Sequence, residues 1–400
     1  MRISGAGLER QGVASDPGAP AISIVSAVAA VIGGSPVDAT WRQRETVAFL
    51  ANPASYGNGR DAVTQVATHC SIVFLVGERA YKLKRAIRFG LADYTTRALR
   101  ARACRAELLL NRRTAPELYR DVCAIVRSAD GTLRFDGPGE MVDTVVVMRR
   151  FAEADQFDRM ADEARLRLEL LRALGHLVAR FHLSVPPSRG FGGAHGLRAA
   201  VEENHRELLR VADPLRAPAL PVLRGRTLAA LAALAPVLER RRDAGEVRRG
   251  HGDLRLANIC LFQGRITLFD CLEFDETLGT VDRLYDLAFL LMDLHMRAPA
   301  LAAPVWASYQ QIAADSGAHP VLGLFLSVRA ATRCYALAGK AMRETTPDLA
   351  ERRMADARRH LAAAHCFLRR PPAWLDEPRR VGIRARQSHQ KQTSLEWLIG

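Results

Sequence analysis

The stretch HGDLRLANICLFQGRITLFD, residues 251–270, places three oxygen-bearing side chains at fixed separations. Asp253 is followed by Asn258 five residues later, and Asp270 comes twelve residues after Asn258. The segment between them has two apolar runs on either side of Gly264, a pattern that predicts a β-hairpin. Because a hairpin returns the chain to its starting point, we expect the three side chains to face one pocket.

These three residue types point to a particular chemistry. Amide and carboxylate oxygens, as at Asn258 and Asp270, are the ligands that Mg²⁺ prefers in proteins. A further carboxylate such as Asp253 can orient or deprotonate a hydroxyl. The order of Asp, Asn, hairpin and Asp is the template found in kinases that transfer phosphoryl groups. The alternative is that each polar residue only caps a turn, which accounts for the residues singly but not for their combined spacing.

A kinase-like site also needs a cation for the nucleotide phosphates and a helix glutamate that holds this cation. The predicted strand RAYKLKR contains Lys82 and Lys84, two of only four lysines in a chain that otherwise uses arginine. Lys82 fits the A-x-K pattern and is the first choice, and Lys84 on the same strand face is the alternative. Glu107, in the helix predicted to follow, is either the partner of this cation or a solvated surface residue.

The composition is that of an ordinary folded chain with an excess of positive charge. The chain has 400 residues, 48% of them hydrophobic and 25% charged, and a net charge of +14. Arginines are spread along the whole sequence, so we predict no nucleic-acid partner. Seven cysteines without a CxxC pair indicate a reducing compartment, and we predict a cytoplasmic protein. The apolar segment 21–34 is too short to span a bilayer, so no membrane association is expected.

The distribution of patterns predicts an α+β fold of two lobes. In the smaller, β-rich lobe we expect hairpins over 71–89 and 123–139 and a strand over 143–151. A helix is expected there over 94–113, with Asp93 or Thr95 as its N-cap. The larger lobe has helical periodicity over 161–184 and again over 281–367. The predicted segments are a disordered N-terminal extension (1–43), a nucleotide-binding N-lobe (44–150), a helical C-lobe with the catalytic loop (151–370) and a disordered tail (371–400).

The motifs HGDLRLAN and ITLFD resemble those of the aminoglycoside phosphotransferase family, whose members have a protein-kinase-like fold. The chain is most similar to the N-terminal part of bacterial bifunctional aminoglycoside phosphotransferase/ATP-binding proteins. The stretches THCSIVFLVGERAYKLKRAIRFGLADY, ELLLNRRTAPELY, VVVMRRF and DRLYDLAFLLMDL also carry this resemblance. The P-loop signature G-x-x-x-x-G-K-[ST] of the second domain of those proteins does not occur, and no G-x-G-x-x-G precedes Lys82.

The resemblance implies a role for each residue of the motifs. Asp253 would be the catalytic aspartate, and His251 would support its loop. Asn258 and Asp270 would bind Mg²⁺, and Asp286 would brace the catalytic loop from behind. The implied ATP contacts are Lys82, Lys84 and Glu107, the phosphate loop over 67–71 with Thr68 and Ser71, and the hinge backbone of Met148, Arg149 and Arg150.

The sequence therefore predicts an ATP-dependent phosphotransferase that acts on a hydroxyl of a small molecule. Seven carboxylates within 270–293 indicate either a cationic amino-sugar or amino-alcohol as acceptor or simply a solvated surface. The alternative function is a kinase-like module that binds nucleotide and regulates a partner without turnover. His176, His182 and His195 lack the spacing of a metal motif and are expected to be packing or surface residues.

Overall fold

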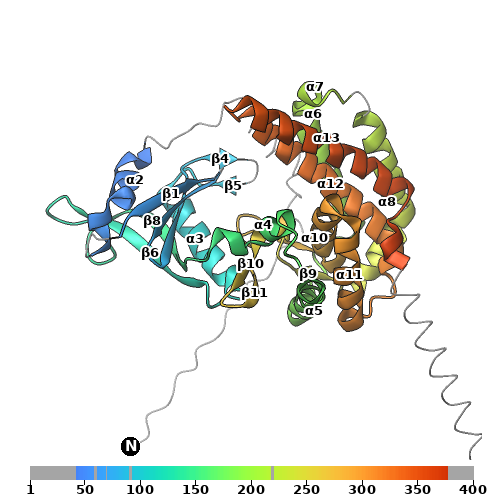
Figure 1. Cartoon of the computed structure of the whole chain (residues 1–400), viewed down its shortest axis with the longest axis horizontal. Coiled ribbons are helices and arrows are strands. Elements are labelled where there is room, and N and C mark those ends of the chain that lie inside the picture. The colour runs from blue at the N-terminus through green and yellow to red at the C-terminus, as the bar shows by residue number, and fades with distance from the viewer. Residues whose placement is uncertain (1–41, 58–60, 69, 90–91, 218–219, 377–400) are drawn as a thin grey trace, which may run out of the picture.

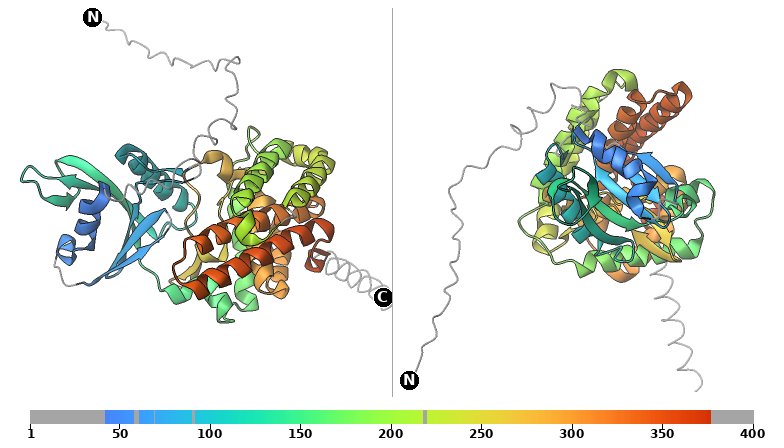
Figure 2. Two further views of the ribbon diagram at one scale, coloured as in Figure 1. Left: turned by 90° about the horizontal axis from the view of Figure 1, so that it is seen from above. Right: turned by 90° about the vertical axis from the view of Figure 1, so that its left-hand side faces the viewer.

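The computed structural model describes residues 42–57, 61–68, 70–89, 92–217 and 220–376. Figure 1 shows a β-sheet lobe beside a larger lobe of helices, with the hairpin β10–β11 between them. The left view in Figure 2, seen from above, shows the same separation of sheet and helices. The predicted α+β, two-lobed fold is therefore confirmed.

The N-lobe is built on one antiparallel sheet with the strand order β1-β2-β3-β8-β6-β7. The hairpin predicted over 71–89 corresponds to β2–β3, and the one predicted over 123–139 to β6–β7. The strand predicted over 143–151 corresponds to β8. Its strands are β1 (Val63–Ala67), β2 (Ser71–Val76), β3 (Arg79–Lys84), β6 (Tyr119–Arg127), β7 (Leu133–Phe135) and β8 (Glu140–Arg149). The other elements of this lobe are α2 (Arg44–Ala51), η2 (Pro53–Tyr56), β4 (Arg88–Phe89), β5 (Ala92–Asp93) and α3 (Arg97–Asn111).

Helix α3 begins later than the sequence predicted, and its N-cap is Thr96 rather than Asp93 or Thr95. The Thr96 hydroxyl accepts a hydrogen bond from the Leu99 amide at 3.2 Å. Thr95 is instead turned back, and both its amide and its hydroxyl donate to the Asp93 carboxylate. Thr96 directly follows the predicted candidate Thr95 and has the same side chain, so the pattern alone could not say which threonine caps the helix.

The two faces of the N-lobe sheet are covered by different parts of the chain. One face packs with α2, where Leu50, Phe74 and Leu83 are fully buried. The other face packs with α3 and also with residues of the hairpin β10–β11, namely Cys260 and Phe262. The core of the small lobe is thus completed by residues from the large one.

Helices make up most of the C-lobe, and α10 and α12 are largely buried within it. The helix predicted over 161–184 starts only at Leu168, because the chain turns at Ala164 with a φ of 54°. The helices are α4 (Phe157–Asp162), α5 (Leu168–Ser184), α6 (Gly193–Arg210), α7 (Ala212–Leu215), α8 (Leu220–Asp243), α9 (Glu276–Gly279), α10 (Arg283–Arg297), α11 (Pro299–Ala313), α12 (Ala318–Met342) and α13 (Pro347–Arg369). Short elements are η3 (Glu153–Asp155), η4 (Leu256–Asn258), η5 (Ala373–Asp376), β9 (Val247–Arg249), β10 (Ile259–Phe262), β11 (Arg265–Leu268) and β12 (Thr280–Asp282).

Both ends of the described chain are packed against the fold. Gln43, placed in the extension by the sequence, is buried and donates to the Lys84 carbonyl at 2.9 Å and to the Asp143 carboxylate at 2.8 Å. Trp374 and Leu375, placed in the tail, are buried, and the Trp306 indole donates to the Leu375 carbonyl at 3.2 Å. The remainder of the predicted extension and tail lies outside the described residues.

Two described helices, α8 and α12, are long and apolar enough to cross a membrane by length and composition alone. In α12, 78% of the apolar window is buried inside the C-lobe, as in the core helix of a folded domain. In α8 this share is 22%, although the helix packs on α6, α12 and α13. Length and apolar composition are weak signals here, because buried core helices have the same properties.

Gly175 provides a test of the packing between α5 and α11. A Cβ atom at this position would lie 2.4 Å from the Val305 carbonyl oxygen, so Gly175→Ala must push the helices apart. We expect it to lower the free energy of unfolding by about 1–3 kcal/mol, measured by urea denaturation. The matched control is Gly225→Ala in α8, where a Cβ meets nothing within 4 Å. That change should raise stability by about 0.5–1 kcal/mol, and equal effects at both sites would contradict the packing described.

Candidate active site

The loop that follows β9 is held from behind by one buried carboxylate. Asp286, in the first turn of α10, accepts hydrogen bonds from the amides of His251 at 2.7 Å and Gly252 at 2.9 Å. The same carboxylate is bonded to His182 Nε2 at 3.1 Å, and both side chains are fully buried. The bracing position expected for Asp286 is therefore observed, and His182 is a packing residue, as predicted.

Asp253 points toward Arg255 and Asn258 within this loop. Arg255 Nε donates to Asp253 Oδ1 at 2.7 Å and its Nη2 to Oδ2 at 2.8 Å, while Asn258 Nδ2 donates to Oδ2 at 2.9 Å. Burial alone would raise the pKa of Asp253, but the Arg255 guanidinium holds it well below its usual range. Asp253 is thus an ionised, oriented hydrogen-bond acceptor and only a weak base.

The hairpin β10–β11 brings Asp270 back to the loop, as the sequence predicted. Its strands pair in antiparallel register, and the Phe269 amide donates to the Asn258 carbonyl at 3.0 Å. Asp270 has a φ of 62°, which turns its side chain out of the strand direction. His251 is fully buried, and its Nε2 lies 2.9 Å from the Phe269 carbonyl oxygen. His251 therefore links loop and hairpin and is not exposed to react.

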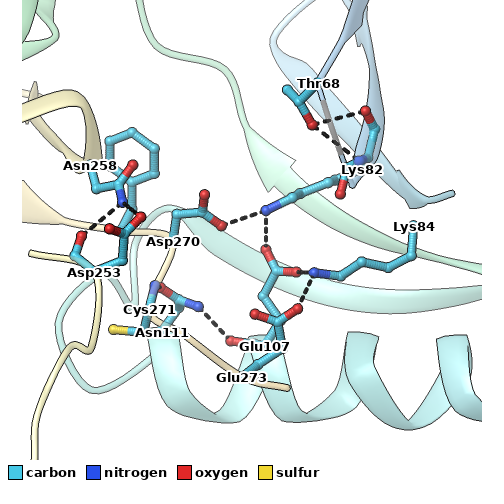
Figure 3. A network of polar contacts seen from close by, with 12 residues as sticks. Thr68, Lys82, Lys84, Glu107, Asn111, Asp253, Asn258, Asp270, Cys271 and Glu273 are labelled. Atoms are coloured by element: carbon cyan, nitrogen blue, oxygen red, sulfur yellow. Dashed lines mark hydrogen bonds and ion pairs between the residues drawn. The ribbon is translucent and has the colours of Figure 1, made fainter. Parts of the chain in front are cut away.

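Both lysines of β3 contact Glu107, as Figure 3 shows. Lys82 Nζ lies 2.7 Å from Glu107 Oε1 and 2.6 Å from Asp270 Oδ1, so it bridges the two lobes. Lys84 Nζ lies 2.5 Å from Glu107 Oε2 and also pairs with Glu273. The sequence left open whether Glu107 is solvated or paired; in the structure it is fully buried between two cations.

Electrostatics fix the charge state of this cluster. Burial opposes charge on Glu107, yet Lys82 and Lys84 lower its pKa to about 2. Burial likewise opposes charge on Lys82, and Asp270 together with Glu107 raises its pKa above the usual value. Glu107, Lys82 and Lys84 are therefore charged at neutral pH. The attraction between the carboxylate and the two ammonium groups offsets the cost of burying them.

The oxygens around Asp270 fit a Mg²⁺ ion that is also held by phosphates. Within the described part of the chain, Asn258 Oδ1 and Asp270 Oδ2 accept no hydrogen bond. No group of three or more His, Cys, Asp or Glu side chains among the described residues is placed to hold a metal. Mg²⁺ commonly takes one or two protein oxygens and completes its octahedron with phosphate and water, so two ligands are sufficient.

A phosphate loop was expected at the turn between β1 and β2. In the structure, the Thr68 hydroxyl of this turn is hydrogen-bonded within the turn itself. Thr68 Oγ1 donates to the Ser71 carbonyl at 2.9 Å and accepts from the Ser71 amide at 3.0 Å. Ser71 itself is buried. The structure thus does not direct the Thr68 and Ser71 hydroxyls toward Lys82 as free donors, and His69 of the same loop lies outside the described residues.

The hinge backbone differs from the expectation in a similar way. Met148 is buried, the Arg149 amide donates to the Leu118 carbonyl at 2.8 Å, and the Arg150 amide donates to the Glu78 carbonyl at 2.7 Å. These amides are therefore used within the N-lobe. In the described chain, the next amides, those of Phe151 and Ala152, have no intramolecular acceptor. Backbone amides without an acceptor in the described chain thus follow the predicted hinge by one or two residues.

Most carboxylates of the acidic segment 270–293 bind protein groups. Glu273 accepts from the Tyr94 hydroxyl at 2.7 Å, and Asp282 pairs with Arg241 at 2.6 Å. Asp275 caps α9, and Asp293 accepts from the Leu256 amide at 3.0 Å. Together with Asp286 and Asp270, they do not form a free anionic surface.

Two residues of the site were missed by the sequence analysis. Arg255 stands inside the quoted motif, and its charge two residues after Asp253 was the available signal. Asn111 donates to the Glu107 carbonyl at 2.8 Å and accepts from the Cys271 amide at 2.8 Å, so it ties α3 to the residue after Asp270. No local pattern marks Asn111, because its second partner is distant in sequence.

Known proteins resemble this chain in sequence and in fold. An uncharacterized protein of Mycobacterium tuberculosis (strain H37Rv) is 29% identical in an alignment of 307 residues that covers 74% of this chain. The chain spans 58% of the length of that relative. An uncharacterized protein of Mycobacterium bovis matches with the same identity and coverage.

Among solved structures, a choline kinase from Cryptosporidium parvum superposes with a TM-score of 0.50 at 11% identity, covering 83% of this chain and 98% of that one. A choline/ethanolamine kinase family protein from Mesorhizobium loti gives 0.45 at 16% identity, covering 81% and 99%. The first of these likenesses concerns the fold alone. The profile of the phosphotransferase enzyme family matches residues 95–325, more than half of the sequence. The chain therefore belongs to the phosphotransferase enzyme family.

Proposed function

We propose that the protein transfers the γ-phosphate of ATP to a hydroxyl group of a small molecule. The observation that carries the proposal is the position of Lys82, which contacts Glu107 on one side and Asp270 on the other. A cation held in this way is preorganised for nucleotide phosphates. Asp253, with its carboxylate fixed by Arg255 and Asn258, lies on the acceptor side of the same site.

In the proposed step, the acceptor oxygen attacks the γ-phosphorus as the bond between that phosphorus and the bridging β–γ oxygen breaks. ADP leaves with the bond's electrons, and the proton of the acceptor hydroxyl passes to Asp253. Because the pKa of Asp253 is low, its main contribution is to orient the hydroxyl, and it takes the proton late. Early orientation and late proton transfer suit a loose transition state, because the attacking oxygen forms little bond to phosphorus until late in the reaction.

The remaining residues of the site would neutralise the phosphate charge and position the nucleotide. Mg²⁺, held by Asn258 and Asp270, would neutralise negative charge on the transferred phosphate. Lys82 would contact the nucleotide phosphates, while Lys84 stays paired with Glu107 and Glu273 and keeps the glutamate in place. The amides of Phe151 and Ala152 are the available donors for the base.

Replacement of Asp253 tests the transfer step. Asp253→Ala removes the acceptor-orienting carboxylate and should lower acceptor-dependent ATP consumption by about 100- to 10,000-fold. Binding of Mg·ATP should change little, because Asp253 does not contact Lys82. ADP release with a panel of hydroxyl compounds measures the first effect, and titration calorimetry with a non-hydrolysable ATP analogue measures the second.

The result of this experiment separates the proposal from the alternative of a regulatory module. If the wild-type protein binds Mg·ATP but no hydroxyl compound accelerates ADP release, the module becomes the better description. Turnover that survives in Asp253→Ala would contradict the role given to this residue.

The two lysines of β3 should behave differently when each is replaced by methionine. Lys82→Met removes the phosphate-facing cation and should weaken ATP binding and turnover at least tenfold. It should cost less stability than Lys84→Met, because Asp270 is partly exposed to water whereas Glu273 is buried. Lys84→Met leaves Glu107 and Glu273 with one partner fewer in a buried place and should cost about 3–5 kcal/mol of unfolding free energy. Thermal melts and ADP-release rates of both variants are compared, and a reversed pattern would assign the phosphate contact to Lys84.

A further inference from the structure

A series of buried hydrogen bonds continues from Asp286 into the C-lobe. His182 on α5 uses both ring nitrogens: Nε2 lies 3.1 Å from Asp286 Oδ2, and Nδ1 lies 3.0 Å from the Tyr309 hydroxyl oxygen. Tyr309 belongs to α11, and its oxygen also accepts a hydrogen bond from Arg283 Nη1 of α10 at 3.1 Å. All four side chains are buried. We refer to these contacts, from Arg283 through Tyr309 and His182 to Asp286, as the buried network.

The partners of each atom determine where the protons of the buried network lie. Asp286 accepts from two loop amides and is an ionised acceptor, so His182 Nε2 is the donor between the two side chains. The Tyr309 oxygen accepts from Arg283, and among the described residues the one acceptor for its proton is His182 Nδ1. His182 is therefore a neutral imidazole with its proton on Nε2, as assigned from its partners. Every hydrogen bond of the network thus points toward Asp286.

The buried network fixes the rotation of the Asp286 carboxylate. Oδ1 accepts from the Gly252 amide at 2.9 Å, whereas Oδ2 accepts from the His251 amide at 2.7 Å and from His182. With three donors in fixed places, the carboxylate has one orientation that satisfies all of them. The two amides directly precede Asp253 in the chain. The orientation of Asp286 therefore influences the direction in which the Asp253 side chain leaves the loop.

Close packing of α5 and α11 brings His182 and Tyr309 together. Gly175 lies two turns before His182, and Val305 lies one turn before Tyr309. A Cβ at Gly175 would lie 2.4 Å from the Val305 carbonyl oxygen, so the absence of a side chain lets the helices approach. The centroids of the imidazole and phenol rings are consequently 5.8 Å apart.

Arg283, at the other end of the network, does not depend on Tyr309 for charge compensation. Its Nη2 lies 3.1 Å from Asp315 Oδ2, and its Nε pairs with Glu246. Asp315 is itself fixed by Arg241 at 2.8 Å. Because two carboxylates already neutralise Arg283, its bond to Tyr309 mainly orients the hydroxyl. The hydroxyl in turn supplies the donor that His182 Nδ1 requires.

We propose that His182 and Tyr309 are positioning residues for phosphoryl transfer, which hold Asp286 in the orientation that accepts both loop amides and thereby direct Asp253 at the acceptor oxygen. This inference rests on the proposed function and adds two residues, distant in sequence from the catalytic loop, on which the rate of the transfer step depends. The cluster assigned to the nucleotide is formed by other residues around Lys82. Loss of the buried network should therefore lower kcat and leave ATP binding nearly unchanged.

Steady-state kinetics of three variants test the inference. ADP release from Mg·ATP is measured with the full-length protein, first with water as the acceptor and then with added glycerol. His182→Leu removes the donor to Asp286 and should lower kcat by about 10- to 100-fold, while KM for ATP changes by less than about twofold. Tyr309→Phe removes one hydroxyl and should lower kcat by about 3- to 10-fold. His182→Gln can still donate an N–H to Asp286 and should retain more activity than His182→Leu.

Ser327→Ala is the matched control for Tyr309→Phe. Ser327 is buried on α12, and its hydroxyl donates to the Ala364 carbonyl at 2.8 Å, in a contact that does not involve Asp286. Each change deletes one buried hydroxyl, so both should lower the melting temperature by a similar amount. With kcat measured well below both melting temperatures, only Tyr309→Phe should be slower than the wild type. Equal kcat values in the two variants would contradict the positioning role.

Nuclear magnetic resonance gives a readout that does not depend on turnover. Amide protons bonded to a carboxylate resonate downfield, so the His251 and Gly252 signals should move upfield in His182→Leu and less in His182→Gln. The ring nitrogens of His182 should show a proton on Nε2 and none on Nδ1. Unchanged amide signals, or a proton on Nδ1, would overturn the inference. If His182→Leu does not fold, Tyr309→Phe provides the same comparison with the loss of a single atom.

Failure of the proposed function looks different. The wild type may release no ADP with water, glycerol or the hydroxyl compounds used for Asp253→Ala, while the amide signals shift as expected in the variants. That result rejects the phosphotransferase and leaves the buried network supported. An active wild type whose kcat is unchanged in His182→Leu and Tyr309→Phe rejects the positioning role and leaves the phosphotransferase intact.

Discussion

The buried Glu107 carboxylate is the contact on which the organisation of the two lobes depends. It lies on α3 of the N-lobe, holds both lysines of β3, and through Lys82 reaches Asp270 of the C-lobe hairpin. An unpaired carboxylate in this position would be very costly, so the strand, the helix and the hairpin must adopt one mutual arrangement. Asn111 strengthens it by joining the Glu107 carbonyl to the Cys271 amide. The charges that would serve the nucleotide therefore also align the lobes.

Around this contact, opposite charges are distributed unevenly. The nucleotide side contains alternating cations and carboxylates, which neutralise one another before any ligand arrives. The side proposed for the acceptor contains the Asp253 carboxylate with Arg255 bound to it. The cluster around Lys82 thus needs little reorganisation to bind the nucleotide that the proposed function requires.

Sequence reasoning succeeded where local pattern and chemistry coincide. The spacing of Asp253, Asn258 and Asp270 implies a hairpin, and the structure has that hairpin with its turn at Gly264. The distinction between Lys82 and Lys84 was harder, since both point to one strand face and only the position of Asp270 separates them. The internal use of Thr68 and of the Arg149 and Arg150 amides could not be predicted, because backbone acceptors leave no trace in the sequence. The acidic segment shows a related limit, because a count of charges does not say which of them are engaged.

The hairpin β10–β11 has a consequence for how the molecule assembles. Its residues Cys260, Phe262 and Phe269 belong to the C-lobe by sequence, yet they complete the apolar core beneath the N-lobe sheet. One face of the small lobe's sheet is consequently covered only when this hairpin docks on it. We therefore expect the two lobes to unfold together rather than as independent domains.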